Sequence, residues 1–201
     1  MALFYDYLNK IGLMGHSLGG AAVFKAAKED NRIKAVVMLD GSLQYINLNE
    51  DIKEGKSLKT PFLNFRRGTI NYEEEMKKAI ELCAVKTDGE TFKKRIIMRD
   101  QTLIGQIEGQ KQLYKYLSSY KSFIKLNHSE HMTFTDWSVI YNEEMVNDIL
   151  PIKKAHDIIS EITYKFLNEF LCGAVGAYSN DIKSNSYPEI SIINSDGDVI
   201  K

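Results

Sequence analysis

Cysteine, proline and long apolar runs are all scarce in this chain of 201 residues. Its two cysteines, Cys83 and Cys172, are far apart and lack metal-ligand spacing, which supports neither a disulfide framework nor a zinc site. We expect both to be buried thiols. No apolar stretch approaches the roughly 18 residues that span a bilayer, and the opening MALFYDYLNK lacks a signal-peptide core. The sequence thus indicates no membrane span and leaves the compartment unknown.

An excess of charge of one sign is also missing. The 26 basic and 27 acidic side chains are interspersed and give a formal net charge of -1. Binding to nucleic acid or to an anionic membrane surface usually needs a strongly basic patch. We therefore expect neither as a partner, and the 44% of hydrophobic residues is typical of a globular domain with a sizeable core.

Apolar runs that alternate with helical segments predict an α/β fold with a mainly parallel sheet. Residues 10–14 form a short apolar run, residues 21–29 are strong helix formers, and residues 33–39 (IKAVVML) read as a strand buried on both faces. Strand, helix and strand of these lengths make a parallel crossover unit. Two further strands are expected at residues 60–65 and 122–126.

The remaining segments suggest how the domain is divided. Helices are expected at residues 71–85 and 105–120, separated by the turn signal Asp88-Gly89, and an amphipathic helix over residues 148–170 closes the domain. We expect residues 1–172 to form the main part of the domain, with residues 71–120 as a lid or pocket wall. The polar tail, residues 173–201, holds one short apolar run (ISII) and is expected to be a loosely attached arm.

Ser17 lies in the motif GHSLGG, between an apolar strand and a helix. A serine nucleophile needs an exposed Oγ, a base, and N–H groups for the oxyanion, and a sharp strand-to-helix turn supplies these together. Such a turn needs very small residues two positions before and after the serine, and these are Gly15 and Gly19. The N–H of Leu18 would be one oxyanion donor. The motif alone is weak; the alternative is a glycine-rich turn that packs on a neighbouring strand.

The chain has four histidines, two of which lie where a base is expected. His128 and His131 both follow the predicted strand at residues 122–126, and parallel strands deliver such groups at their carboxyl ends. His131 is favoured because it opens the segment HMTFTDW, whose aromatic residues can anchor the loop in the core. His16 should point away from the serine Oγ as a pocket or packing residue, and His156 should be structural. Either loop histidine could also be a satisfied loop residue.

Asp40 is the favoured acid because it ends the strand IKAVVML, one crossover after the serine. The next strand is followed by Arg-Arg-Gly, with no carboxylate before Glu73. Glu73 and Asp136 are therefore weaker candidates. An ordinary turn or helix-cap aspartate is the alternative for Asp40, since Asp-Gly-Ser is a common turn sequence.

Together, GHSLGG, MLDGS and HMTFTDW resemble the platelet-activating-factor acetylhydrolase-like branch of the α/β-hydrolases, over roughly residues 8–172. The resemblance implies that Ser17 is the nucleophile, Asp40 the orienting acid and His131 the base. From the turn itself, we expect Leu18 and His16 to be the residues at the oxyanion or substrate. The family's sheet has several strands before the elbow, together with the loop that donates the other oxyanion N–H. This chain has at most a partial helix (LFYDYLN) there, so we expect a partial hydrolase fold whose early strands are missing.

The predicted function is hydrolysis of a small or lipid-like carboxylic ester through an acyl-enzyme, without metal or cofactor. A dienelactone- or acetylxylan-type esterase or a peptidase is possible on the same scaffold, because specificity lies in the pocket. A non-catalytic, hydrolase-like chain that retains the elbow is the alternative from another class. An exposed edge on the first strand would also favour self-association of the chain.

Overall fold

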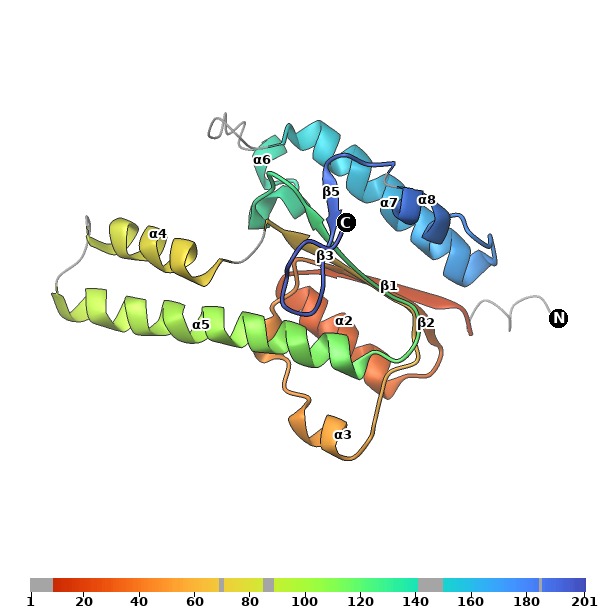
Figure 1. Cartoon of the computed structure of the whole chain (residues 1–201), viewed down its shortest axis with the longest axis horizontal. Coiled ribbons are helices and arrows are strands. Elements are labelled where there is room, and N and C mark those ends of the chain that lie inside the picture. Colours follow the sequence, from red (N-terminus) through yellow and green to blue (C-terminus); the bar gives the residue numbers. More distant parts are fainter. Residues whose placement is uncertain (1–8, 69–70, 85–88, 141–149, 185) are drawn as a thin grey trace.

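The computed structural model describes residues 9–68, 71–84, 89–140, 150–184 and 186–201 (Figure 1). These residues form an α/β fold around a sheet with strand order β1-β2-β3-β4-β5. The first four strands run parallel and the fifth is antiparallel to the fourth: β1 (Ile11–His16), β2 (Ile33–Leu39), β3 (Phe62–Arg67), β4 (Lys121–Leu126) and β5 (Ile190–Ile192). The predicted fold class and the four predicted parallel strands are confirmed, with ends that shift by one or two residues.

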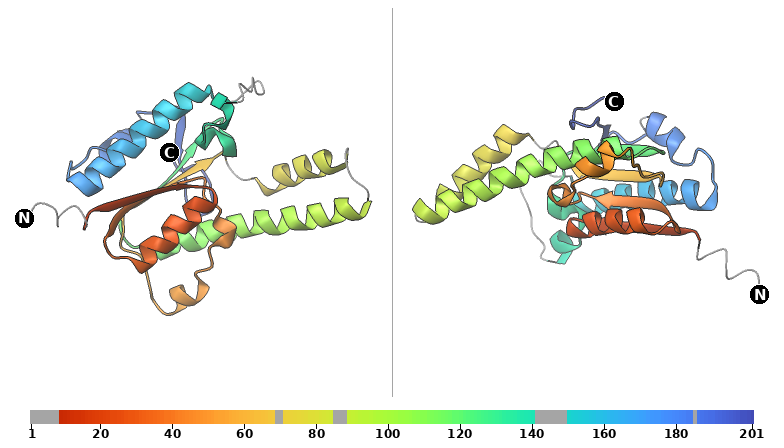
Figure 2. Two further views of the ribbon diagram at one scale, coloured as in Figure 1. Left: turned by 180° about the vertical axis from the view of Figure 1, so that it is seen from behind. Right: turned by 90° about the horizontal axis from the view of Figure 1, so that it is seen from below.

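Helices cover both faces of the sheet (Figures 1 and 2). On one face lie α2 (Leu18–Glu29) and the second half of α5 (Gly89–Tyr116), and on the other lies α7 (Ile152–Cys172) with α8 (Ser179–Ser184) beside it. The shorter elements are η1 (Leu43–Tyr45), α3 (Asn49–Lys53), α4 (Tyr72–Ala84), η2 (His131–Phe134) and α6 (Trp137–Ile140). Within the described ranges, no helix combines the length and apolarity that a membrane crossing requires.

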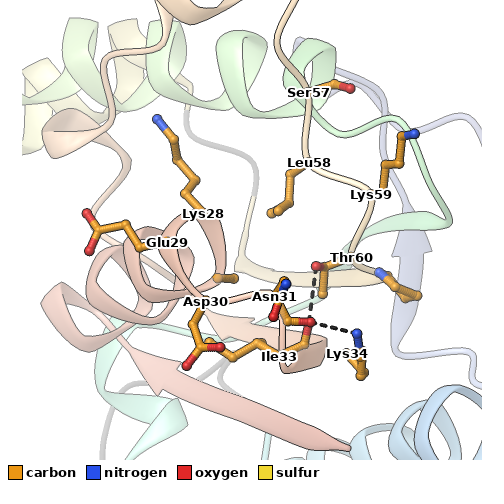
Figure 3. A pocket seen from close by; sticks show the side chains of 12 residues that line it. Lys28, Glu29, Asp30, Asn31, Ile33, Lys34, Ser57, Leu58, Lys59 and Thr60 are labelled. Atoms are coloured by element: carbon orange, nitrogen blue, oxygen red, sulfur yellow. Dashed lines mark hydrogen bonds between the residues drawn. The ribbon is translucent and has the colours of Figure 1, made fainter. Parts of the chain in front are cut away.

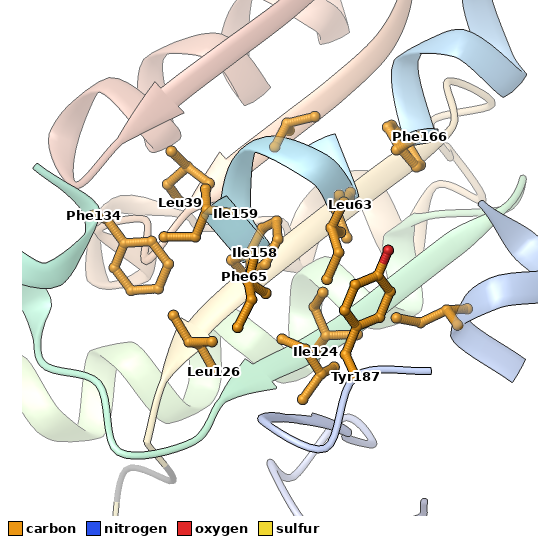
Figure 4. Close-up of a cluster of buried hydrophobic side chains, with 14 of the residues drawn as sticks. Leu39, Leu63, Phe65, Ile124, Leu126, Phe134, Ile158, Ile159, Phe166 and Tyr187 are labelled. Carbon is orange, nitrogen blue, oxygen red and sulfur yellow. The ribbon is translucent and has the colours of Figure 1, made fainter. Parts of the chain in front are cut away.

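The central strand β2 explains why two cores form. Successive side chains of a strand point to opposite faces, and all of β2 except Lys34 is buried. Val37 and Leu39 join the core under α7, whereas Val36 and Met38 join the core under α2 and α5. Figure 4 shows the first of these cores, in which aliphatic and aromatic side chains of α7 meet those of the sheet. A continuous apolar run therefore becomes a strand covered on both sides.

The helix α5 is longer than the sequence predicts. It begins at Gly89, the expected turn, and continues to Tyr116, so residues 89–104 were missed as helix. Of residues 89–102, none is buried, and this half of the helix lies beside α4 and projects with it beyond the sheet (Figures 1 and 2). A helix with no well-buried face has no regular apolar stripe in its sequence, and the prediction relied on such a stripe.

The second half of α5 lies very close to η1. A Cβ on Gly109 would lie 2.1 Å from the carbonyl oxygen of Leu43, and one on Gly105 would lie 2.8 Å from Cβ of Gln44. Only glycine allows this approach, which brings the intervening Gln106 to the carboxyl end of the sheet. There its Oε1 accepts a hydrogen bond of 3.3 Å from the N–H of Leu43.

The C-terminal tail is part of the fold, so the expectation of a loosely attached arm is wrong. Strand β5 extends the sheet beyond β4, and Tyr178, Ile182 and Ile190 are buried in the core under α7. Tyr178 Oη also donates a hydrogen bond of 2.6 Å to Ser122 Oγ, a group of β4. The apolar residues of the tail are spread among polar ones without a regular period, which concealed their burial. Whether residues 173–201 should be divided from residues 1–172 stays a prediction.

Two smaller expectations concern the chain's thiols and its first residues. Cys172 is exposed at the end of α7, so the prediction that it is buried is wrong, and the side chain of Cys83 lies outside the described part of the chain. The partial helix predicted from LFYDYLN falls on residues that the structure does not describe, apart from Asn9. In the described sheet β1 is the edge strand, paired only with β2. Self-association through that edge stays a prediction.

Candidate active site

The carboxyl ends of three parallel strands bring a serine, an aspartate and a histidine together. Ser17 follows β1, Asp40 follows β2, and His131 opens η2 after β4. His131 Nε2 lies 3.0 Å from Ser17 Oγ, and His131 Nδ1 lies 2.6 Å from Asp40 Oδ2. Both distances are within hydrogen-bonding range. The three residues that the sequence singles out as nucleophile, acid and base are thus in direct contact.

Ser17 has an unusual backbone conformation, with φ 55° and ψ -122°. A residue other than glycine in such a region costs on the order of 1–3 kcal/mol, and hydrogen bonds at the turn hold it there. The Ser17 N–H donates to the carbonyl of Leu39 at 3.1 Å, and the Ser17 carbonyl accepts from Gly20 N at 3.0 Å. Ser17 is the N-cap of α2, but its side chain makes no capping hydrogen bond. The hydroxyl is therefore available to His131.

The glycines around this turn do not have equal roles. A Cβ on Gly15 would lie 2.3 Å from the carbonyl oxygen of Gly19, and one on Gly20 would lie 2.8 Å from Met38 Cγ and 2.9 Å from Gly41 Cα. A Cβ on Gly19 would meet nothing within 4 Å. The expectation that Gly19 must be small is wrong, because the crowded position after the serine is Gly20. The pair Gly19-Gly20 in the sequence is the signal that could have indicated the crowding at Gly20.

Asp40 is 2% exposed and has two arginines around it. Arg66 Nη1 lies 3.3 Å from Oδ1, and Arg67 Nη1 donates to Oδ2 at 3.0 Å. Burial opposes the ionisation of Asp40, but the charge of Arg66, the hydrogen bond from His131 and the charge of Arg67 outweigh it and hold the pKa of Asp40 well below its usual range. The acid is therefore an ionised carboxylate throughout the neutral pH range.

Arg66 and Arg67 are neighbours of Asp40 that the sequence did not lead us to expect. In the sequence, these two arginines were noted only because no carboxylate follows β3 at their positions. Arg66 is 2% exposed, and it donates to the Gly41 carbonyl at 3.0 Å and to Gln106 Oε1 at 3.2 Å. Burial lowers the pKa of Arg66, and the negative charge of Asp40 opposes that shift. A pair of arginines at the end of a buried apolar strand is the available signal, because a buried guanidinium requires an anion.

Contacts with the core and with α7 hold the loop that carries His131 in place. Phe134 is buried, with its ring 6.2 Å from that of Phe65, as the sequence predicts. Trp137 is 44% exposed, so the expectation that it anchors the loop in the core is wrong. His156 on α7 instead donates from Nε2 to the Thr133 carbonyl at 3.1 Å, which agrees with its predicted structural role.

His16 lies behind His131 rather than beside the serine hydroxyl. Its Nε2 donates to the His131 carbonyl at 3.0 Å, and the two ring centroids are 4.5 Å apart. Burial lowers the pKa of His16, and the neighbouring His131 lowers it further. His16 therefore supports the loop as a neutral ring. Its predicted contact with substrate stays a prediction, as does the oxyanion role of Leu18, whose side chain is 62% exposed.

The other candidates lie away from this cluster. His128 is exposed, and its carbonyl accepts from Leu150 N at 2.7 Å. Glu73, on α4, and Asp136 are both exposed, whereas the carboxylate that contacts His131 belongs to Asp40. In the described part of the chain, no group of three or more His, Cys, Asp or Glu side chains could hold a metal ion.

Ser42 is a second hydroxyl at the cluster that the sequence argument did not use. Its side chain is buried, its Oγ lies 3.4 Å from Ser17 Oγ, and its N–H donates to the Ser17 carbonyl at 2.8 Å. Ser42 is thus joined to Ser17 by both backbone and side chain. The signal for it was its position two residues after Asp40, in the same strand-end turn.

One hollow on the surface lies away from this site. A cavity of about 580 Å³ lies between the end of α2 and the segment before β3, at the amino end of the sheet (Figure 3). Its polar contacts are local: Thr60 Oγ1 donates to the Ile33 carbonyl at 3.3 Å, and Lys34 Nζ donates to the Asn31 carbonyl at 2.6 Å. It is therefore at the opposite end of the strands from Ser17.

The family model for platelet-activating factor acetylhydrolase, isoform II, matches residues 6–174 of the chain. The chain belongs to this family of α/β-hydrolases. A solved structure, the ferulic acid esterase from Streptomyces cinnamoneus, is similar in fold, with 21% sequence identity and a TM-score of 0.60. The match covers 93% of this acetylhydrolase-family chain and 47% of the esterase, so the chain spans about half the length of that protein. No curated protein sequence matches the chain significantly.

Proposed function

We propose that this chain carries the active site of a serine carboxylic ester hydrolase, with Ser17 as nucleophile, His131 as general base and Asp40 as the group that orients the base. The observation that carries the proposal is the hydrogen-bonded series from Ser17 Oγ through His131 to Asp40, at 3.0 and 2.6 Å. Membership in a hydrolase family supports the same reaction class.

The geometry fits acyl transfer in two steps. His131 donates a hydrogen bond from Nδ1–H to Asp40, which leaves Nε2 free to accept the proton of Ser17 as Oγ attacks the ester carbonyl. The tetrahedral intermediate then expels the alcohol, which takes the proton from His131, and Ser17 is left acylated. Water, deprotonated by His131, attacks this acyl-enzyme and releases the carboxylic acid, while the proton returns to Ser17. Because its pKa is depressed, Asp40 remains an anion opposite the imidazolium that forms in each step.

The oxyanion would lie at the amino end of α2. Leu18 is the first residue of this helix, and the N–H groups of a first helical turn have no partner within the helix. The turn at Ser17 places the Leu18 N–H beside the nucleophile, as in a nucleophile elbow. We propose it as one oxyanion donor. We also propose the α4–α5 pair as a wall of the pocket, since Gln106 of α5 accepts a hydrogen bond from Arg66, the partner of Asp40.

The substrate class proposed is a small or lipid-like carboxylic ester. A dienelactone- or acetylxylan-type esterase, or a peptidase, would use the same three residues, so substrate profiling separates these alternatives. No metal or cofactor takes part in the steps above.

The test is labelling of the purified chain with a fluorophosphonate, with the modified residue identified by mass spectrometry. Ser17→Ala and His131→Ala are the test variants, and Ser118→Ala is the matched control, a hydroxyl bonded to Ser57 at 3.0 Å at the other end of the sheet. We expect rapid labelling at Ser17, lost in both test variants and kept in the control, with hydrolysis of p-nitrophenyl acetate following the same pattern. A folded chain, by circular dichroism, that is not labelled would overturn the proposal for this chain.

A further inference from the structure

A groove of about 470 Å³ begins at Leu18, the residue that follows Ser17, and runs along α2. One wall is a single face of that helix, at positions 18, 21, 22, 25, 28 and 29, which the helical repeat brings into line. The other wall runs from Tyr45, the last residue of η1, to Leu48, and the buried ring of Phe24 also lines the groove.

The lining of the groove is apolar next to the serine and charged at its far end. Leu18, Ala22 and Tyr45 line the near part, and Leu18 and Tyr45 are 62% and 68% exposed. Large apolar side chains that are this exposed beside a nucleophile indicate an apolar ligand group. At the far end are Lys25 and Lys28, the latter paired with Asp51.

The position of His131 decides which half of an ester the groove would hold. His131 must protonate the departing alcohol, so the alcohol lies on the His131 side of Ser17. Among the described residues, none of η2 or α6 lines the groove, whose walls come from α2 and residues 45–48. The acyl half, which remains attached to Ser17 Oγ in the acyl-enzyme, is therefore the half that can enter it.

The length of the apolar part sets the length of the acyl group. From Leu18 to Lys25 is seven residues, or about 10 Å along the helix axis at 1.5 Å per residue. An extended chain advances about 1.2 Å per backbone bond, so roughly eight carbons fill this distance before the first charge.

We propose that this groove, the α2 groove, is the acyl-binding subsite and that it selects esters of straight apolar acids of about eight carbons. This inference rests on the proposed function, since it uses Ser17 as the site of acylation. Because one side of the groove is open, each methylene should contribute about half of the gain of full burial, or roughly twofold in kcat/KM. From acetate to octanoate, six methylenes then give about a 60-fold increase.

The experiment compares p-nitrophenyl acetate with p-nitrophenyl octanoate, using Ala22→Trp to fill the groove. Ala22 lies on the exposed side of α2, so the larger side chain need not disturb the core. Val175→Trp, at a position that is 94% exposed and outside the groove, is the matched control. We expect Ala22→Trp to reduce the preference for octanoate over acetate to below about fivefold, while the control keeps the full preference. A preference unchanged in Ala22→Trp overturns the subsite.

Two further measurements separate the possible failures. If Ala22→Trp instead lowers hydrolysis of octyl acetate relative to ethyl acetate, the groove holds the alcohol and the acyl assignment is wrong. Calorimetric titration of Ser17→Ala with octanoate does not depend on catalysis. Octanoate binding to Ser17→Ala that is lost in Ser17→Ala/Ala22→Trp supports the groove. If the wild-type chain also hydrolyses no ester, only the proposed function is overturned. Absence of octanoate binding together with absence of a chain-length preference overturns the groove alone.

Discussion

Replacing Asp40 by asparagine should separate two roles of one buried carboxylate. The variant keeps the shape of the side chain but removes the anion beside Arg66, whose side chain is 3% exposed, and beside Arg67, whose side chain is 19% exposed. Breaking a buried ion pair from one side costs about 3–5 kcal/mol. At about 2–4 °C per kcal/mol for a chain of this size, Tm should fall by roughly 6–20 °C.

The same substitution should lower the rate by about 10⁴-fold. The asparagine amide can donate to His131 Nδ1, and this favours the tautomer that carries its proton on Nε2 and cannot accept one from Ser17. The assay is the fluorophosphonate labelling rate, measured below Tm so that the variant is folded. Asp157→Asn, an exposed aspartate on α7, is the matched control and should change neither Tm nor rate.

The loss of stability should depend on pH in a definite direction. The pKa of Asp40 is lowered in the folded chain, so its stabilising effect is complete above the unfolded value of about 4 and is lost as the pH falls towards the folded value. The Tm difference between the wild type and Asp40→Asn should therefore be constant above about pH 5 and shrink below about pH 4. Equal Tm values at pH 7 would refute the buried-pair argument, and an unchanged labelling rate would refute the orienting role.

Three other perturbations test the site and its supports. Ser42→Ala should lower kcat about 3- to 10-fold with KM nearly unchanged, the effect of one hydrogen bond, and Ser42→Thr should restore most of it; equal kcat in both variants would exclude a role for the hydroxyl. Gly20→Ala should lower Tm by several degrees, because its Cβ would lie 2.8 Å from Met38 Cγ, while Gly19→Ala should melt like the wild type; the reverse order would contradict the described turn. Deleting residues 175–201 removes β5 and several buried side chains, each contributing about 1.5–3 kcal/mol, so the shortened chain should show no cooperative urea transition.

Much of the fold could be predicted because its main signals are local. The run IKAVVML becomes β2 at the predicted residues, and Ser17, Asp40 and His131 each follow a predicted strand directly. Parallel strands share one carboxyl edge, so the order of strands along the chain was enough to bring the three side chains together.

The missed features depend on contacts between distant parts of the chain. Arg66 is at the site because of a carboxylate 26 positions earlier, which no local pattern records. Tyr178 is buried by α7 and β4, although the sequence around it is polar. The first half of α5 lies beside α4 and away from the sheet, so its sequence lacks the apolar stripe of a helix that packs on a sheet. Gly19 and Gly20 look equivalent in the sequence, but only a Cβ on Gly20 would collide with Met38 and Gly41.

The positive φ of Ser17 has a consequence for how this sequence is maintained. Glycine adopts such a conformation without steric cost, so Ser17→Gly should melt a few degrees above the wild type while losing all labelling. Because the glycine variant is expected to be more stable, selection for stability alone would replace the serine, and random substitution would not preserve it. A chain that retains it sacrifices thermal tolerance for a hydroxyl at that point, and this trade-off is typical of a residue that is in use.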